Sequence, residues 1–226
     1  STAAMSRHPM VVPMLRIDRE AIPAAAISAL PAAVAAATGR RGLAAVLCAL
    51  PVGVTLFFRD PDRLPDVGTT HEDDVLSPAD GKVMYAGPGQ PQVAPEGDWQ
   101  QVSIFLSAFD VHINRSPVAG TVTEVTYRPG KWLAAYKHES AYLNERSDLT
   151  VEAVVRGQRR VVKFRQIVGL MARRVVTRVK VGQEIAAGER IGLMKFGSRM
   201  DIFVPLECVV LVSKEDRVVA GESVIA

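Results

Sequence analysis

The sequence predicts a mainly β protein, a pseudo-duplicated β-sandwich or barrel-sandwich hybrid that follows an N-terminal apolar helical hairpin. From about Val75 onward, short runs rich in Val and Ile recur between turn residues, a spacing typical of all-β sandwiches and barrels. One turn pattern occurs twice in this region, which indicates an internal duplication. Two almost uncharged apolar runs precede it and flank a short basic turn, which favours a helical hairpin.

The hairpin is expected at residues 21–58, with apolar runs at 21–38 and 43–58. Each run is roughly 25 Å long as a helix, slightly short of a hydrocarbon core of about 30 Å. Because neither run has a polar face, we expect a membrane-associated hairpin that either spans the bilayer or dips into it. A buried hairpin packed on the domain is the alternative.

The remaining segments follow from charge and turn residues. Residues 1–20 are expected to form an N-terminal tail. Residues 59–74 are expected to form a linker, because the charged stretch RDPDR ends the apolar run abruptly and Pro65 and Gly68 follow it. Residues 75–226 then form the β-rich domain.

The strands of this domain are predicted from short apolar runs bounded by turn residues. They are expected at residues 82–86, 101–106, 121–127, 149–156, 159–168, 175–179, 190–194, 200–204 and 209–212. The stretch 131–146 is expected to be helical or irregular.

The internal repeat has the pattern S-P-x-x-G-x-V, which occurs at residues 77–83 and again at 116–122. Each copy is a turn that leads into a strand. A third glycine-bearing turn at 181–189 resembles the hammerhead turns of lipoyl- and biotinyl-type sandwiches. Together these turns favour a pseudo-duplicated sandwich over a chance similarity between two short turns.

The composition excludes some classes of function. The 27 basic and 24 acidic residues leave a net charge of +3, without the long basic blocks of a nucleic-acid-binding arm, so we expect no nucleic-acid partner. Cys48 and Cys208 are expected to be small buried hydrophobes in a reducing compartment. The four histidines lack metal-ligand spacing, so no metal site is expected.

The pair Gly197–Ser198 lies between two predicted strands. Its simplest interpretation is a tight turn. It also permits backbone chemistry, because Gly leaves its carbonyl open to approach and Ser places a hydroxyl one peptide bond away. Attack of Ser198 on the Gly197 carbonyl converts the amide into an ester, and β-elimination then leaves dehydroalanine, which becomes a pyruvoyl group and ammonia.

This attack needs a base to accept the hydroxyl proton and a carboxylate to orient that base. His112 and Asp80 are the plausible pair. A lone histidine beside apolar residues is more often structural than catalytic, so these residue types alone leave both interpretations open.

Five short elements occur in an order that resembles the short form of the phosphatidylserine decarboxylase family. They are FFRDPDR at 57–63, SPADG at 77–81, FDVH at 109–112, NER at 144–146 and FGS at 196–198. The similarity extends from about residue 20 to the C-terminus and includes the apolar hairpin.

The resemblance implies a self-cleavage triad of Asp80, His112 and Ser198. It implies cleavage between Gly197 and Ser198, which leaves a large β chain and a small α chain headed by a pyruvoyl group, the covalent pyruvate cofactor. The expected reaction converts phosphatidylserine into phosphatidylethanolamine and CO2 through a Schiff base, with no metal or separately bound cofactor.

The sequence departs from longer relatives, which carry a second histidine three residues before the triad histidine. Phe109 stands there in this chain, so His112, His138 or a water is the candidate proton donor in the decarboxylation. Basic residues around the site are the candidates for contact with the lipid phosphate; with His138, they are Arg115, Lys131, Lys137 and Arg199.

A lipid substrate also explains the hairpin, since the active site must reach the bilayer surface. We therefore expect a protein at the cell membrane, peripheral or anchored by the hairpin, with a cytoplasmic catalytic domain. A homodimer is among the assemblies that the sequence leaves open. The alternatives are a pyruvoyl decarboxylase for a soluble amino acid and a carrier domain modified on Lys195.

Overall fold

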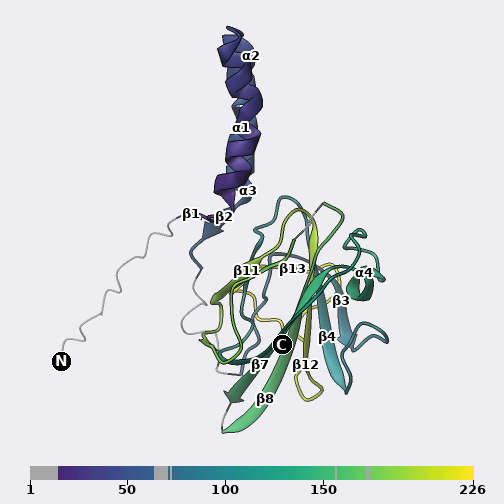
Figure 1. The fold of residues 1–226 in the computed structure, drawn as a ribbon. Helices are drawn as coiled ribbons and strands as arrows, with labels where there is room; N and C mark the ends of the chain where they lie inside the picture. Colours follow the sequence, from purple (N-terminus) through teal and green to yellow (C-terminus); the bar gives the residue numbers. More distant parts are fainter. Residues whose placement is uncertain (1–14, 64–70, 72, 156, 172–173) are drawn as a thin grey trace, which may run out of the picture.

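A helical hairpin projects from one end of a curled β domain (Figure 1). The structure is a computed structural model that describes residues 15–63, 71, 73–155, 157–171 and 174–226. The predicted segments 1–20 and 59–74 therefore lie partly outside the described residues.

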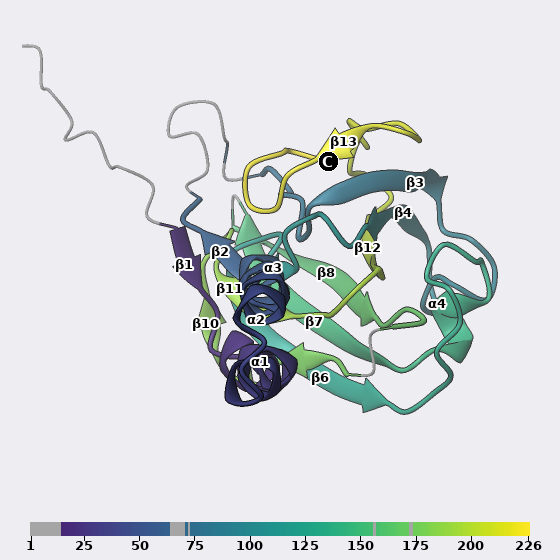
Figure 2. The same cartoon turned by 90° about the horizontal axis from the view of Figure 1, so that it is seen from above.

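The hairpin consists of α1 (Ala21–Ala37), which returns through α2 (Arg41–Leu47) and α3 (Ala49–Phe57). Both α2 and α3 pack along α1, and Figure 2 shows the three helices end-on at one side of the domain. The predicted apolar helical hairpin is thus confirmed. None of the helices in the described ranges is both long and apolar enough to span a membrane.

Only the base of the hairpin packs on the β domain. Ala21, Phe57 and Phe58 are buried there in one apolar cluster, which also contains Val111, Ile113 and Leu193. Farther along the hairpin, large apolar side chains are exposed; they include Ile27, Leu30, Val34, Val46 and Val52. The hairpin therefore does not adopt the buried arrangement that was the alternative.

A small antiparallel sheet joins the hairpin to the domain. It pairs β1 (Leu15–Ile17) with β2 (Arg59–Pro61) and places Arg16 opposite Asp60. Residues 15–17 and 59–61 are thus strands within the predicted tail and linker.

The domain is built on an eight-stranded antiparallel sheet in the order β10-β6-β7-β8-β12-β4-β3-β13. Its strands are β3 (Gly81–Pro88), β4 (Trp99–Leu106), β6 (Gly120–Arg128), β7 (Arg146–Val155), β8 (Gln158–Ile167), β10 (Glu184–Ile185), β12 (Ser198–Pro205) and β13 (Arg217–Val218). A second sheet joins β5 (Ile113–Arg115), β11 (Arg190–Leu193) and β9 (Val176–Thr177). The short helix α4 (Ser140–Leu143) lies in the stretch expected to be helical or irregular.

The curled sheet encloses one main hydrophobic core, to which alternate residues of its central strands contribute. Fully buried members include Val83, Ile104, Leu149, Phe164, Met200 and Ile202. The predicted strand at 209–212 is wrong: these residues are not in a strand, although Leu211 donates a backbone hydrogen bond to Ile225. This segment pairs too briefly to form a ladder.

The predicted duplication is confirmed by matching contacts in the two repeat turns. The Ser77 hydroxyl donates to the Ala79 carbonyl at 2.7 Å, and the Ser116 hydroxyl donates to the Val118 carbonyl at 2.6 Å. The glycines that end the turns have φ values of 153° and 154°. A Cβ on either glycine would overlap a carbonyl oxygen of the neighbouring strand, so only glycine fits.

The third turn, at residues 181–189, has a counterpart at residues 214–222 that was not recognised from the sequence. Residues 181–189 read VGQEIAAGE, and residues 214–222 read KEDRVVAGE. The first pairs with β6 through β10, and the second pairs with β3 through β13. The two halves of the domain therefore repeat a turn, a strand and a hammerhead-like segment.

Candidate active site

The predicted cleavage site lies in the tight turn between β11 and β12. Phe196 has a φ of 47° and Gly197 a φ of 68°. Two successive residues are thus left-handed, and for a phenylalanine this conformation costs about 1–3 kcal/mol. The peptide bond that the chemistry would break therefore lies one residue after a strained phenylalanine.

The carbonyl of Gly197 is held against another glycine. A Cβ on Gly169 would overlap the Gly197 carbonyl oxygen, and it would lie 3.3 Å from the Cβ of Ala135. Gly169 has no side chain, so the cleavage turn can press closely against the segments around residues 135 and 169.

Ser198 is the first residue of β12 and is completely buried. It lies opposite Leu106 in the ladder with β4. Its Oγ donates a hydrogen bond of 3.3 Å to the carbonyl of Lys195. The hydroxyl is therefore held inside the turn by the Lys195 carbonyl.

His112 is buried beside this turn, at the start of the second sheet. Its ring lies 4.3 Å from that of Phe57, which stacks on Phe196 at 4.1 Å. The Nδ1 atom lies 2.9 Å from the carbonyl oxygen of Asp110. Because a carbonyl only accepts, Nδ1 carries the proton and Nε2 presents its lone pair. Nε2 is buried and has no hydrogen-bond partner among the described residues.

The environment keeps the His112 imidazole neutral. Burial lowers the pKa of His112 from 6.5 to about 4, although the Asp110 carbonyl and the charges of Asp110 and Asp80 act in the opposite direction. A neutral imidazole with a free, buried Nε2 is the form that can accept a proton from a hydroxyl at neutral pH.

Asp80 lies at the end of the first repeat turn, within electrostatic reach of His112. Its carboxylate accepts hydrogen bonds from the Arg63 guanidinium and from the backbone N–H of Ala220. In the described residues, no hydrogen bond joins Asp80 to His112. The group that orients the imidazole in this structure is the Asp110 carbonyl, which sequence reasoning missed because main-chain atoms carry no sequence signal.

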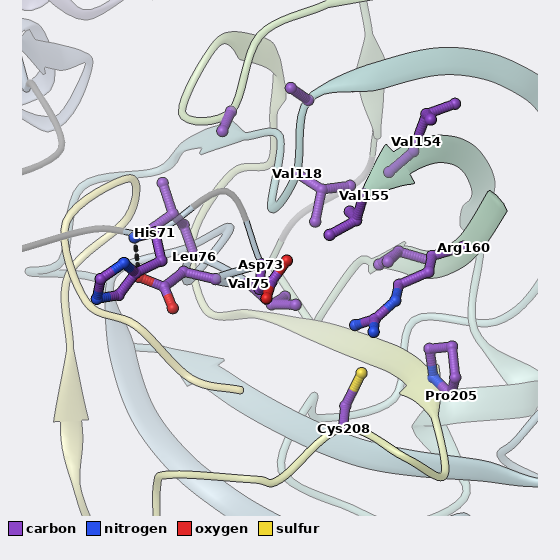
Figure 3. Close-up of a pocket in the computed structure, with 15 residues that line it drawn as sticks. His71, Asp73, Val75, Leu76, Val118, Val154, Val155, Arg160, Pro205 and Cys208 are labelled. Atoms are coloured by element: carbon purple, nitrogen blue, oxygen red, sulfur yellow. Dashed lines mark hydrogen bonds between the residues drawn. The ribbon is translucent and has the colours of Figure 1, made fainter. Parts of the chain in front are cut away.

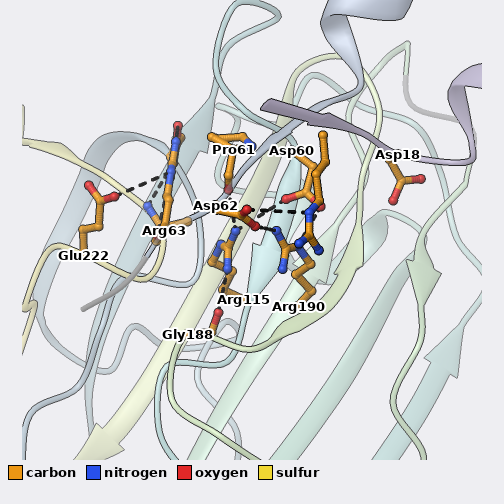
Figure 4. A network of polar contacts seen from close by, with 12 residues as sticks. Asp18, Asp60, Pro61, Asp62, Arg63, Arg115, Gly188, Arg190 and Glu222 are labelled. Carbon is orange, nitrogen blue, oxygen red and sulfur yellow. Dashed lines mark hydrogen bonds and ion pairs between the residues drawn. The ribbon is translucent and has the colours of Figure 1, made fainter. Parts of the chain in front are cut away.

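Arg115 lies in a network of buried charges at the hairpin base (Figure 4). It is 4% exposed and donates to the Pro61 and Gly188 carbonyls, each at 2.9 Å. It also pairs with Asp60, which accepts a second bond from Arg190 at 2.6 Å. These contacts hold the guanidinium inside the protein, and the contact of Arg115 with the lipid phosphate stays a prediction.

Arg199 is also buried rather than available to a ligand. It is 3% exposed, and its Nε donates to Asp201 at 2.7 Å. A second bond of 3.2 Å reaches the Ser103 hydroxyl. The phosphate contact through Arg199 likewise stays a prediction.

The other predicted substrate-binding residues lie on an exposed segment near the cleavage turn. Lys131, Lys137 and His138 are all exposed. Ala135 of the same segment approaches Gly169. The segment therefore approaches the cleavage turn at Ala135, while its basic side chains are exposed.

Phe109 occupies the tip of the loop between β4 and β5 and is 88% exposed. With Phe57 and Phe196 it lines an open apolar groove of about 460 Å3 against α3, and Arg59 lies in the lining as well. The Arg59 guanidinium donates to the Phe109 carbonyl at 2.5 Å. The hairpin and the candidate active site thus share a continuous apolar surface.

A second pocket, of about 360 Å3, lies away from the cleavage turn (Figure 3). It is lined by residues of the second repeat that correspond to site residues of the first. Its lining includes Ala119, which precedes the repeat glycine as Asp80 does in the first half. Arg160 occupies the ladder position that corresponds to Ser198. The described lining residues include no serine, so this pocket lacks the nucleophile of the first half.

A buried serine that ends a turn strained at a phenylalanine, with a buried neutral histidine beside the same turn, defines a class of β proteins equipped to cleave their own backbone. Comparison with known proteins agrees with this class. A sequence model of phosphatidylserine decarboxylases matches residues 52–226, which include the whole β domain. The chain belongs to the phosphatidylserine decarboxylase family.

Several curated relatives are similar over most of their length, and each is named a phosphatidylserine decarboxylase proenzyme. The protein of Symbiobacterium thermophilum is 48% identical over 185 residues, covering 81% of this chain and 82% of the relative. That of Solibacter usitatus is 46% identical over 170 residues, which cover 75% of this chain and 76% of the relative. That of Geotalea daltonii is 41% identical over 208 residues, which cover 91% of this chain and 93% of the relative.

Proposed function

We propose that this chain is a proenzyme that cleaves itself at Gly197–Ser198 and then decarboxylates phosphatidylserine to phosphatidylethanolamine. The observation that carries the proposal is the buried Ser198 hydroxyl in a turn strained at Phe196, with the buried His112 packed against the same turn through Phe57. Membership of the family and the proenzyme names of the relatives support it.

Self-cleavage begins when Ser198 Oγ attacks the carbonyl carbon of Gly197. His112 Nε2 accepts the hydroxyl proton and returns it to the departing amide nitrogen, so that the peptide becomes an ester. Loss of the Ser198 α-proton and cleavage of its Cβ–O bond release the Gly197 carboxylate and leave dehydroalanine. Tautomerisation and addition of one water release ammonia and leave a pyruvoyl group.

The residues present fit a pyruvoyl group at position 198. Ser198 is fully buried at the start of a central strand, which holds the group rigidly. The group supplies a conjugated carbonyl that accepts the electrons released as CO2 leaves. For the return of a proton to substrate carbon, His112 is the buried candidate of this chain and His138 the exposed one.

The hairpin supports a role at the cell membrane. It exposes apolar side chains on most of its length, and Arg40 and Arg41 lie at its tip. An exposed apolar surface of this kind marks an interaction site, and a diacyl lipid substrate makes the bilayer surface its natural partner. In this arrangement the apolar groove under Phe109 opens toward the lipid, with the catalytic domain on the cytoplasmic side.

Intact-mass measurement under denaturing conditions tests the proposal. We expect two fragments, residues 1–197 and residues 198–226. The mass of the smaller one should be lower, by the mass of ammonia, than that of the same fragment with an N-terminal serine. Ser198→Ala should remain whole and should not release CO2 from phosphatidylserine liposomes. An active preparation that consists only of uncut chain would contradict self-cleavage, and turnover of free serine rather than the phospholipid would contradict the substrate.

A further inference from the structure

Two nearly buried charged side chains, Arg63 and Asp80, pair beside the candidate active site. The Arg63 guanidinium donates to both carboxylate oxygens: Nη1 to Oδ1, and Nη2 to Oδ2 at 2.7 Å. The Ala220 N–H also donates to Oδ1, at 2.9 Å. The two side chains are only 9% and 14% exposed. These three bonds hold the Asp80 carboxylate in one orientation.

The internal repeat shows that the fold does not need this pair. In the second half, Ala119 stands where Asp80 stands in the first. The turn there nevertheless keeps its serine-to-carbonyl bond and its close glycine. A nearly buried ion pair is also weak support for stability, because desolvation offsets much of the attraction. The pair is therefore a feature of the half that contains the candidate active site.

Among the described residues, the bonds to Asp80 leave part of its carboxylate available. There Oδ1 accepts from Arg63 and from Ala220, whereas Oδ2 accepts a single bond. A carboxylate oxygen has two acceptor positions, so Oδ2 retains one. The charge of Asp80 already acts on His112 by opposing the fall of its pKa.

We propose that Arg63 is a positioning residue for self-cleavage, which acts by holding Asp80 where its charge stabilises the His112 imidazolium formed during attack. This inference rests on the proposed function. Arg63 also donates to the Ala220 carbonyl at 3.2 Å and lies 4.0 Å from Glu222. Both residues follow the cleavage site, so Arg63 connects the two future chains at the point where Asp80 is held.

The test follows self-cleavage of the full chain after synthesis in vitro, on denaturing gels. Arg63→Met should slow cleavage by about 10- to 100-fold, the usual effect of misplaced groups in an active site. Arg63→Lys should be intermediate, because an ammonium cannot hold both oxygens as a guanidinium does. Added guanidinium ion should partly restore Arg63→Ala. Arg16→Met, which removes a largely exposed ion pair with Asp62, is the matched control and should cleave normally.

Dependence on Asp80 separates positioning from a general loss of structure. In an Asp80→Asn background, Arg63→Met should slow cleavage little further, since the two residues act as one unit. Normal or faster cleavage by Arg63→Met or Arg63→Lys would overturn the inference, as would an equal slowing in the presence and absence of Asp80. Normal cleavage by Asp80→Asn itself would remove Asp80 from the triad and so overturn this inference, whereas failure of the parent chain to cleave would refute the proposed function.

Discussion

At the scale of single residues, the site depends on atoms whose protonation is set by burial. His112 is 2% exposed, and its Nδ1 is committed to the Asp110 carbonyl. Its ring packs against Phe57, which in turn stacks on Phe196. The same burial that prepares the imidazole as a base also links the stability of the fold to pH.

The pKa of His112 falls from 6.5 to about 4 on folding. Between these pH values the unfolded chain binds more protons, so stability is present above about pH 6.5 and is lost as the pH falls toward 4. In the uncut Ser198→Ala chain, this residue alone should lower the free energy of unfolding by roughly 2 kcal/mol between about pH 7.5 and pH 5. Urea unfolding at the two pH values measures it.

Replacing His112 by Gln in that chain should remove this part of the pH dependence. His138→Gln is the matched control, because His138 is exposed and its loss should leave the dependence intact. Equal pH dependence in the His112→Gln chain and its parent would contradict a buried, neutral His112.

At the scale of elements, the hairpin stands out because it exposes many large apolar side chains to solvent. Its base is fixed by packing of Phe57 and Phe58 and by ion pairs, among them Asp18 with Arg178 at 2.6 Å and Glu20 with Lys195 at 3.0 Å. Lys195 belongs to the cleavage turn. The hairpin is thus attached rigidly to the site, while its outer surface remains apolar.

Three exposed hairpin residues, Ile27, Val46 and Val52, allow a test of membrane binding without a cost in core packing. Burial of each apolar side chain contributes about 1.5–3 kcal/mol. Changing all three to Glu should therefore reduce flotation with phosphatidylserine liposomes by about tenfold or more, while self-cleavage continues. Retained flotation would show that the hairpin is not the attachment.

The matched control places the same three charges on exposed apolar residues of the β domain. Val154, Val181 and Val209 are all more than half exposed. The control variant should float as the parent does, because only the hairpin is expected to enter the bilayer surface.

At the scale of the whole molecule, the proposed cut falls at the start of a central strand. β12 pairs with β4 on one side and with β8 on the other. Met200, Ile202 and Val204 of this strand belong to the main core. The fragment that begins at residue 198 is therefore built into the domain on both edges and on its apolar face.

We accordingly expect the two fragments to stay together after cleavage. Gel filtration in native buffer should give one species of the same size as the uncut Ser198→Ala chain, and denaturing gels should separate two fragments. Removal of the 198–226 fragment should require conditions that unfold the domain, because the sheet loses its centre. Spontaneous release in native buffer would contradict this account.

Much of the architecture follows from local sequence patterns. Alternating Val and Ile residues in short runs predict the strands, because the strand pleat has a period of two. The repeat glycines at 81 and 120 predict turns, because no Cβ fits where each backbone meets the next strand. The turn at 214–222 was missed because only its last three residues match its counterpart at 181–189. The similarity of the other residues lies in their strand pairing, which the sequence does not show.

The sequence also indicated the candidate residues Gly197–Ser198, His112 and Asp80, through their types and through the order of the family motifs that contain them. Only the tertiary structure decided which charges surround them. Arg63 and Asp60 come from a predicted linker, yet both are nearly buried against residues far along the chain. Arg115 and Arg199 are committed to internal ion pairs. The physical reason is that strand and turn patterns are local, whereas burial of a charge depends on a partner that folding brings from elsewhere.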